Sequence, residues 1–464
     1  MISVVLEPDG KRPLYEQLYL GIKEEIKSGR LRGGEKLPSK RKMADYLQIS
    51  LRTVENAYAQ LALEGYVAGV EKKAYYVQVV EQAGAKKALK AAWPTRPAAT
   101  DVPSVWVHDL KTNRINMEDF PFSVWAKLMR QSLRDESSAL IEPVHPQGDY
   151  ALRQEIVNYL RQFRNMEVDA EQVVVGAGTE YLLGLITELL KGRVFALEEP
   201  NYHKPALILK SRAVDFHAIN IDHEGLCLDK LNRTNASVVL ITPSHHFPLG
   251  TVMSINRRLQ LLQWASQSRE RYLIEDDYDS EYRFNLKPVP PLHSLDRYNK
   301  VIYMNTFTRT LAPSLRIAYL VLPPALSNIY RQKLMFYACT VSAVEQYTLC
   351  KFMKGGYYER HLNRIRNICK TRRDTLLKGL EPLSEALSIH GQEAGLHLLL
   401  TSKKDMSDKT MVLRAAKKGI RVYGLSDYYL EPAKRTSTVI AGYGGFNISD
   451  LTQAAKLLVE AWRN

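Results

Sequence analysis

An apolar stripe with the spacing of a helix is the first regular pattern along the chain. It consists of Leu14, Leu18, Ile22 and Ile26. Residues four positions apart lie on one face of a helix, so this segment predicts an amphipathic helix packed against a small core. Glycines follow soon after the stripe, and they predict where the helix ends.

Two shorter helices are predicted next, each with a serine at its start. Ser39 can cap a helix that ends at Leu47, and Ser50 can cap a helix that runs to Glu64. Gly65 then suits the left-handed position that often follows a helix. Two short helices joined by a tight turn predict a helix-turn-helix, whose second helix leaves a polar face for base edges and phosphates. That polar face carries Arg52, Thr53, Asn56 and Gln60.

A hairpin and then a linker are predicted after the helices. The strand-like runs YVAGV and AYYVQVV flank a basic tip that contains Lys72 and Lys73, and such a tip can approach the DNA backbone or minor groove. The stretch 80–105 shifts to Ala, Lys and Pro, which is typical of a linker. We therefore expect one domain over 1–79 and a second over 106–464.

The rest of the chain alternates apolar, β-rich runs with helical segments. The runs include VVVGAG, VFALEEP, VVLITPS, YLIEDD and VIYMNTF. This alternation predicts an α/β domain with a largely parallel sheet covered by helices. From about residue 365 long helices mix with strands such as LHLLL and TVIAGYG, so we expect a smaller C-terminal part there.

Composition and charge narrow the compartment and the chemistry. The formal net charge of +14 is compatible with a polyanionic partner such as DNA, although charge alone does not identify one. No apolar run is long enough to span a membrane and the start lacks the layout of a signal peptide, so we expect a cytoplasmic protein. The four cysteines form no C-x-x-C pair. His245 and His246 are adjacent on a predicted strand and would point to opposite faces, so no metal site is expected.

The N-terminal segment resembles a GntR-type winged helix over its whole length. The resemblance rests on PLYEQLYLGIKEEIKSGRLRGGEKLPSKRKMADYLQISLRTVENAYAQLALEGYV, which contains the LPS-x-R motif at 37–41. The candidate contacts to double-stranded operator DNA are then Ser39, Lys40, Arg41, Arg52, Thr53, Asn56, Lys72 and Lys73. The family usually opens its reading helix with Ser-Arg-x-Thr, whereas here the arginine stands one residue later, about 100° around the helix.

Motifs of the second domain resemble those of fold-type I aminotransferases, in the order that family shows them. They are HPQGDYALRQEI, VVVGAGTEYLL, LEEPNYHKP, TPSHHFPLG, YLIEDDYDSEY, YMNTFTRTLAPSLRIAYLVLP and AGLHLLL. Together with the N-terminal domain they resemble the MocR/GabR regulators over nearly the whole chain. The resemblance implies a homodimer and a pocket for pyridoxal phosphate.

The implied pocket gives each part of pyridoxal phosphate its own partner. The set is Gly178, Thr179, Tyr202, Asp276, Tyr278, Thr306, Arg309 and Arg316. Asp276 would face the pyridine nitrogen, Tyr278 would donate to O3′ and Tyr202 would stack on the ring. The phosphate would meet the N–H groups of the loop that enters a helix at Thr179, together with the charge of Arg316.

Arg309 occupies the position of the Schiff-base lysine. A guanidinium stays protonated at ordinary pH and its lone pairs are delocalised, so it cannot form the Schiff base or move a substrate proton. No lysine lies between Lys300 and Lys333 to replace it. We therefore expect no catalytic residue, and pyridoxal phosphate would bind only noncovalently.

Three further positions depart from the family. Gly445 stands where some members carry an arginine that binds the substrate carboxylate, and Arg309 or Lys204 could take that role from another side. Phe247 stands where aminotransferases usually carry an asparagine that bonds O3′. Glu180 stands where glutamine is common, and it adds a negative charge beside the phosphate site unless it points to solvent.

These features predict a DNA-binding transcription regulator whose degenerate aminotransferase-like domain senses a small molecule. The candidate effectors are noncovalent pyridoxal phosphate and an amine or amino-acid metabolite. Two alternatives stay open: an aminotransferase tethered to DNA, which the missing lysine argues against, and a regulator whose large domain only dimerises. Visible absorption separates them, because a Schiff base of the cofactor absorbs there.

Overall fold

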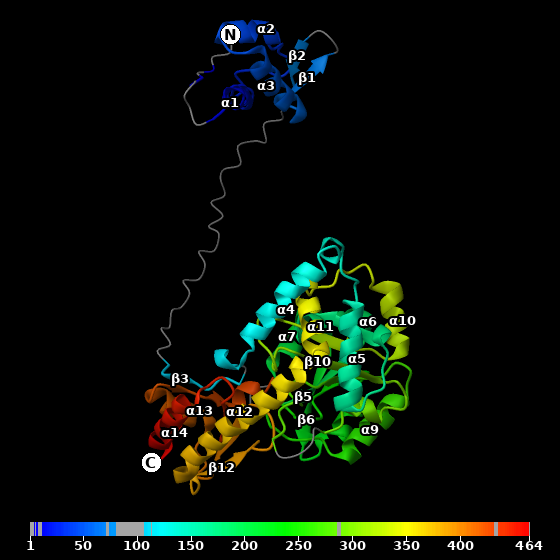
Figure 1. The fold of residues 1–464 in the computed structure, drawn as a ribbon, viewed down its shortest axis with the longest axis vertical. Coiled ribbons are helices and arrows are strands. Elements are labelled where there is room, and N and C mark those ends of the chain that lie inside the picture. The colour runs from blue at the N-terminus through cyan, green and yellow to red at the C-terminus, as the bar shows by residue number, and fades with distance from the viewer. Residues whose placement is uncertain are drawn as a thin grey trace. The chain divides into compact units, whose positions relative to one another are not determined.

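The computed structural model describes residues 4, 6–7, 12–70, 74–79, 106–112, 114–284, 289–430 and 435–463. The chain divides into two units, Met1–Ser104 and Val105–Asn464 (Figure 1). The predicted linker over 80–105 lies outside the described residues, and so do Lys72 and Lys73 of the predicted hairpin tip. No helix in the described ranges is both long and apolar enough to cross a membrane.

The N-terminal unit contains three helices and a short antiparallel hairpin. Its elements are α1 (Leu14–Lys27), α2 (Lys40–Leu47), α3 (Leu51–Leu63), β1 (Val67–Val70) and β2 (Ala74–Val77). The Ser39 hydroxyl caps α2 by accepting from the Lys42 N–H at 3.3 Å. The Ser50 hydroxyl caps α3 by accepting from the Thr53 N–H at 3.1 Å. Gly65 follows α3 with a φ of +75°, so both predicted helix starts and the predicted helix end are present.

The apolar faces of α1 and α3 form the core of this unit. Its fully buried side chains include Leu18, Ile22, Val54, Ala57, Tyr58 and Leu61. Each buried side chain of this size stabilises a fold by roughly 1.5–3 kcal/mol relative to an exposed one. The core therefore holds α3 in place and leaves its polar face to solvent.

An eight-stranded sheet forms the centre of the second unit. Its order is β4 (Val173–Gly176), β11 (Ala318–Val321), β10 (Val301–Thr306), β9 (Tyr272–Asp276), β8 (Val238–Ile241), β5 (Phe195–Glu199), β6 (Phe216–Asp222) and β7 (Gly225–Leu226). The successive pairs from β10 to β6 are parallel, whereas β11 is antiparallel to both of its neighbours and β7 is antiparallel to β6. The predicted, largely parallel sheet is confirmed.

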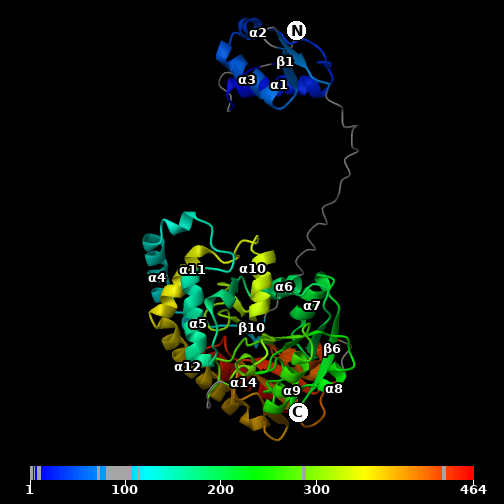
Figure 2. The same ribbon diagram turned by 90° about the vertical axis from the view of Figure 1, so that its right-hand side faces the viewer.

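Helices cover both faces of this sheet (Figures 1 and 2). They are α4 (Phe122–Asp135), α5 (Tyr150–Arg164), α6 (Thr179–Leu189), α7 (His203–Ser211), α8 (Leu228–Leu231), α9 (Ile255–Ser266), α10 (Pro324–Lys333) and α11 (Ala343–Lys354). Successive residues of β4 belong to different apolar clusters. Val175 shares a cluster with Ile156 of α5, and Val174 shares one with Leu182 of α6. The sequence of a strand that is buried on both faces is a continuous apolar run, which explains the VVVG pattern.

The smaller C-terminal part packs helices on a four-stranded antiparallel sheet. Its elements are α12 (Tyr357–Leu380), β12 (Leu387–His390), β13 (His397–Ser402), α13 (Asp408–Lys417), β14 (Ile420–Arg421), β15 (Tyr423–Gly424), β16 (Thr438–Gly442) and α14 (Ile448–Trp462), with the sheet order β12, β13, β16, β15. The helix α12 crosses the boundary predicted near residue 365. The early strand β3 (His108–Asp109) pairs in parallel with β14, and the Gly442 N–H donates to Leu110 O at 2.8 Å. The start of the second unit therefore runs along the end of β16.

Candidate functional site

The exposed face of α3 carries the side chains predicted to read DNA. Arg52 and Asn56 are exposed, while Tyr58 on the other face is fully buried. Thr53 is half-buried, and its hydroxyl lies 2.8 Å from Ser50 Oγ. The structure thus presents Arg52 and Asn56 to solvent, as the spacing predicted, and gives Thr53 a capping contact as well.

The LPS-x-R segment has a structural role besides its predicted one. Ser39 caps α2, and Lys40 Nζ lies 3.5 Å from Glu55 Oε1 and 5.6 Å from the centre of the Tyr75 ring. The charge of Lys40 is therefore partly engaged inside the unit. Arg41 is exposed and forms no ion pair with any residue in the described ranges. Among the described residues, Arg41 is thus the cation of this segment without an ion-pair partner.

A cavity of about 250 Å³ lies beside the carboxyl ends of β9 and β10 and the start of α6. Seven of the eight residues predicted for the cofactor pocket line it: Thr179, Tyr202, Asp276, Tyr278, Thr306, Arg309 and Arg316. They come from segments far apart in the sequence. A parallel sheet brings such segments to one edge, where ligands of α/β proteins commonly bind.

Gly178 lies at the start of α6 and acts differently from the prediction. Its N–H donates to Gly176 O at 2.8 Å, so this donor is already used within the loop. Its φ is +89°, and a Cβ at this position would overlap the Arg316 guanidinium. Glycine therefore allows Arg316 to approach the first turn of the helix. Arg316 itself has a φ of +53°, a left-handed conformation that is uncommon for residues other than glycine and tends to occur at functional sites.

An internal carboxylate pairs with Arg316. Glu180 forms ion pairs with the Arg316 guanidinium and with Lys204 Nζ, the second at 2.6 Å. Burial raises the pKa of Glu180, but hydrogen bonds from Lys204 and Arg316 outweigh burial and bring it down to about 2. The carboxylate is therefore ionised at neutral pH, and its place in the first turn of α6 also favours negative charge. Glu180 lines the cavity, although its side chain keeps 29% of its surface exposed.

Thr306 orders the loop that carries two of the cavity arginines, Arg309 and Arg316. The residue is buried, and its hydroxyl donates to Thr308 Oγ1 at 2.8 Å. The same oxygen accepts from the Thr308 N–H at 3.1 Å. These contacts fix the turn after β10, so the turn holds Arg309 in a set position.

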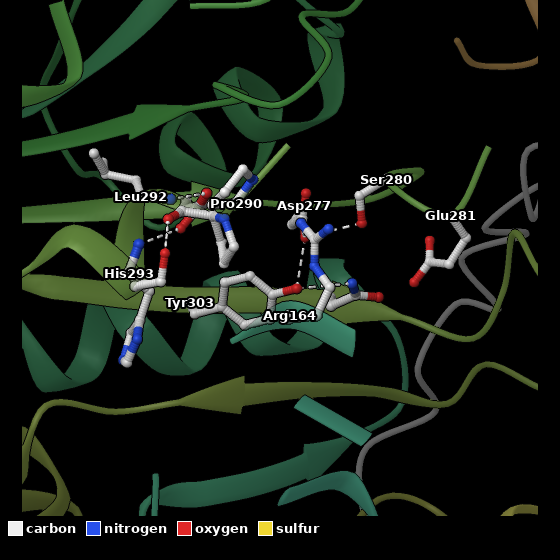
Figure 3. A network of polar contacts seen from close by, with 12 residues as sticks. Arg164, Asp277, Ser280, Glu281, Pro290, Leu292, His293 and Tyr303 are labelled. Carbon is white, nitrogen blue, oxygen red and sulfur yellow. Dashed lines mark hydrogen bonds and ion pairs between the residues drawn. The ribbon is translucent and has the colours of Figure 1, made fainter. Parts of the chain in front are cut away.

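Buried polar contacts fix the end of the strand that carries Asp276 (Figure 3). Asp277 forms an ion pair with Arg164 at 2.5 Å and accepts from the Tyr303 hydroxyl at 2.6 Å. Glu275 accepts from two backbone N–H groups at 2.7 and 2.9 Å. Successive side chains of a strand alternate between its faces, so Asp276 points opposite to these two acids.

Asp276 presents an unsatisfied acceptor at the cavity. Its Oδ1 is buried and has no hydrogen-bond partner within the described part of the chain. Burial and the nearby Asp277 raise the pKa of Asp276 to about 7, although Arg309 opposes the shift. A buried acceptor without a partner is costly, and it indicates that a ligand supplies the donor.

Arg309 places a cation in the cavity. Its Nη1 donates to Thr112 O at 3.0 Å, and its guanidinium lies 5.3 Å from the centre of the Tyr278 ring. Arg309 forms no ion pair within the ranges the structure describes. Its charge is therefore available to an anionic ligand.

Aromatic rings form one wall of the cavity. Phe247 is nearly perpendicular to Tyr202 and to Tyr278, with centroids 6.0 and 6.3 Å away. Tyr202 is 37% exposed, so its ring remains free to stack on a ligand. The Tyr278 hydroxyl lies 3.2 Å from His245 Nδ1 and is thus already engaged.

His245 and His246 lie in the turns after β8 and not on a strand as expected, and their side chains have different partners. His245 Nδ1 lies 2.8 Å from Asp279 Oδ2, whereas His246 Nε2 lies 3.7 Å from Glu198 Oε2. Burial lowers the pKa of His246 to about 3, so its ring is neutral. Among the described residues, no group of three or more His, Cys, Asp or Glu side chains is placed to hold a metal ion.

Arg114 is a cavity residue that the sequence did not indicate. It lines the cavity and lies 3.3 Å from Asp109 Oδ2. A Cβ at Gly445 would overlap the Arg114 side chain, so glycine at this position leaves room for Arg114. No local signal could have identified the contact, because it joins opposite ends of the second unit.

Positive charge dominates the lining of this cavity. Its described cations are Arg114, Lys204, Arg309 and Arg316, and its described acids are Glu180 and Asp276. Glu180 forms ion pairs with Lys204 and Arg316, whereas Arg309 has no ion-pair partner among the described residues. This balance favours a ligand that carries an anionic group.

Known proteins resemble both units of the chain. Residues 14–77 match the family described as "Bacterial regulatory proteins, gntR family", and residues 107–439 match "Aminotransferase class I and II". The crystal structure of multiple substrate aminotransferase from Thermococcus profundus superposes with a TM-score of 0.69 at 23% identity, over 79% of this chain and 95% of that one. This likeness shows the fold of the second unit.

Two relatives match both units together. The uncharacterized HTH-type transcriptional regulator YdeL of Bacillus subtilis is 37% identical over 454 residues, which is 97% of each chain. The probable rhizopine catabolism regulatory protein MocR of Rhizobium meliloti is 29% identical over 99% of this chain and 96% of its own. The chain therefore belongs to the HTH-type transcription regulators that join a GntR-type DNA-binding domain to an aminotransferase-like domain.

Proposed function

We propose that this regulator senses a small molecule in the cavity of its second unit and does not catalyse transamination. The observation that carries the proposal is Arg309, which stands in a cavity that still contains Tyr202 and Asp276. Because its guanidinium stays protonated and delocalised, it cannot supply the amine of a Schiff base. A ligand that binds one state of the protein better than another shifts their populations, so occupancy without turnover is sufficient for regulation.

Lys204 does not replace the missing amine. It is the one lysine in the described lining of the cavity, and its Nζ lies 2.6 Å from Glu180 Oε1. This hydrogen bond raises the pKa of Lys204, so the amine is protonated at neutral pH. A protonated amine has no lone pair to attack a carbonyl, which argues against an aminotransferase tethered to DNA.

The cavity suits the ring of pyridoxal phosphate, but it suits neither the aldehyde nor the phosphate of that cofactor. Asp276 Oδ1 lacks a partner and suits a protonated ring nitrogen, and Tyr202 offers a face for stacking. Arg309 offers no amine to the aldehyde. Glu180 already forms an ion pair with Arg316, whose guanidinium would otherwise hold the phosphate. Pyridoxal phosphate therefore does not fit these residues as a whole, and no reaction step is expected through it.

The proposed effector is a pyridoxal compound held without a covalent bond, or an amine or amino-acid metabolite. Arg114 and Arg309 supply guanidinium groups that bind carboxylates well. Asp276 supplies an acceptor that suits either an amine or a protonated ring nitrogen. Both effector classes therefore use the same donors and acceptors of the cavity.

We also propose that the regulator acts as a cytoplasmic homodimer. The resemblance to fold-type I aminotransferases supports dimerisation through the second unit. A dimer presents two reading helices to two half-sites of an operator. Linking them raises the effective concentration of the second helix once the first is bound.

A ligand screen on the full chain tests the proposal. Amino acids, amines and pyridoxal compounds are added singly, and thermal unfolding is followed; a ligand at a hundred times its Kd adds about 2.7 kcal/mol to the free energy of unfolding. A stabilising compound should also change the affinity for DNA fragments that the protein selects from genomic DNA. A protein that no compound stabilises would mean that the second unit only dimerises. A visible Schiff-base band in the wild-type protein would contradict the proposal that a pyridoxal compound is held without a covalent bond.

A further inference from the structure

We infer that Glu180 is a built-in anion at the phosphate end of the cavity, and that it makes the cavity select unphosphorylated ligands over phosphorylated ones. The inference rests on the proposed function, because it concerns the same cavity and specifies the class of effector. It is carried by the contacts of Glu180 with two cations that approach it from different elements.

Two cations converge on the Glu180 carboxylate. Lys204 reaches it from the first turn of α7, and Arg316 reaches it from the loop before β11. Neither cation has another ion-pair partner in the described ranges. The absence of a Cβ at Gly178 lets Arg316 lie against the first turn of α6, so the position of this pair is built into the loop.

The Glu180 carboxylate therefore competes with a ligand phosphate, because both would pair with the same two cations. A phosphate dianion could reach Arg316 and Lys204 only by displacing Glu180, or by lying beside its negative charge. Displacement breaks two ion pairs, and proximity adds repulsion between like charges. Either way, phosphate binding is weakened by the protein's own side chain.

The size of the effect follows from the exposure of the three side chains. Glu180, Arg316 and Lys204 keep 29%, 43% and 50% of their side-chain surface exposed. Solvent screens ion pairs at such positions, so each contributes modestly. We therefore expect removal of the Glu180 charge to strengthen phosphate binding about tenfold, and not by several orders of magnitude.

The other end of the cavity depends only weakly on Glu180, whose charge raises the pKa of Asp276 less than burial and Asp277 do. Asp276 Oδ1 and the Tyr202 ring are the groups that suit a pyridine ring, and neither contacts the Glu180 carboxylate through a hydrogen bond within the described residues. A ligand with a ring but no phosphate should therefore bind almost equally well with or without the Glu180 charge. This difference makes the inference testable with two closely related probes.

The experiment compares pyridoxine 5′-phosphate with pyridoxine by isothermal titration calorimetry on the full chain. Both probes lack an aldehyde, so neither condenses with lysines, and they differ only in the phosphate. In Glu180→Gln the affinity for pyridoxine 5′-phosphate should rise about tenfold, while that for pyridoxine should change less than twofold. Inorganic phosphate should compete with the phosphorylated probe more strongly in the variant than in the wild type.

Glu188→Gln is the matched control. Glu188 lies on the same helix, pairs with Arg212 at 3.4 Å and does not line the cavity, so the same change of charge should leave both affinities unaltered. Thermal unfolding checks that each variant is folded, and Glu180→Ala provides a second variant should the first be unstable.

Three results would overturn the inference. They are an unchanged affinity of Glu180→Gln and Glu180→Ala for the phosphorylated probe, an equal gain for both probes, and no binding of either probe at millimolar concentration. Failure of the proposed function has a different signature. In that case the phosphate preference shifts as expected, but no probe alters the affinity for DNA.

Discussion

The two units of the chain follow their families to different degrees. In the N-terminal unit, the serine caps, the buried faces and the exposed face of α3 all lie where the sequence pattern predicts them. In the second unit the sheet and the cavity are kept, but the groups that would hold the reactive parts of a cofactor have changed. Under the proposal above, Arg309 stands in place of the amine, and Glu180 pairs with Arg316, the arginine proposed to bind a phosphate.

This difference shows that residues in a cavity can change while the fold around the cavity is kept. The apolar clusters on both faces of the large sheet stabilise the second unit whatever stands in the cavity, because burial does not depend on a nucleophile. A surface that reads DNA has no such freedom, since its contacts depend on which side chains reach the bases.

The largest expected effect is the loss of DNA affinity when the reading unit is detached. Residues 1–79 alone should remain folded on their own core but bind the operator at least about a hundredfold more weakly than the full chain, because the second half-site is no longer linked. The measurement is fluorescence anisotropy of labelled operator, with circular dichroism as the check on folding. Equal affinity of the fragment and the full chain would contradict the dimer proposal.

A smaller effect is expected from one side chain on the reading helix. Arg52→Ala should weaken operator binding by roughly 1–3 kcal/mol, or about five- to 150-fold, and relax sequence selectivity, because Arg52 is exposed on α3. Lys27→Ala removes an equally exposed charge at the end of α1 and is the control. If both variants lose affinity equally, Arg52 contributes only general charge.

The smallest effect concerns stability and pH. Burial raises the pKa of Asp276 from about 4 to about 7, so the folded chain binds a proton that the unfolded chain has released. The free energy of unfolding therefore falls as pH rises from about 4 to about 7. Asp276→Asn removes this contribution and should raise Tm by roughly 3 °C or more at pH 7.5, and by less at pH 5.

The same variant should also bind pyridoxine more weakly, since the amide cannot carry the charge that pairs with a protonated ring nitrogen. Asp229→Asn, at an exposed position of α8, is the control and should change neither stability nor binding. A Tm difference between Asp276→Asn and the wild type that stays constant with pH would show that the carboxyl does not titrate in this range.

Local signals in the sequence predicted the elements well. Capping serines, left-handed glycines and apolar runs depend on neighbours along the chain, so Ser39, Ser50 and Gly65 have the expected roles. The antiparallel strand β11 was not foreseen, because its direction depends on pairing with β4 and β10 and not on its own residues.

The sequence predicted which residues line the site, but it did not predict the contacts between their side chains. Family order identified seven residues that the structure brings to one cavity. It did not reveal that Glu180 bridges Arg316 and Lys204, because the three charges lie on separate elements. Arg114 was missed for the same reason, since its place depends on the room left by Gly445.

The central claim is that the cavity retains a place for the cofactor ring, lacks a usable amine, and weakens phosphate binding through Glu180. It is tested most directly by Arg309→Lys, examined alone and with Glu180→Gln. After incubation with pyridoxal phosphate, the variant should show a visible absorption band and a borohydride-trapped adduct at position 309, because ring contacts hold the aldehyde near the new amine. The double variant should reach half-saturation at lower cofactor concentration.

The wild-type chain is the reference for this measurement, and it should give no adduct at position 309. Transaminase activity of Arg309→Lys should stay weak, since Gly445 leaves the substrate carboxylate without the family's usual arginine. An Arg309→Lys protein that takes up no pyridoxal phosphate at millimolar concentration, with or without Glu180→Gln, would contradict the account, because it would show that the cavity has been rebuilt for an unrelated ligand.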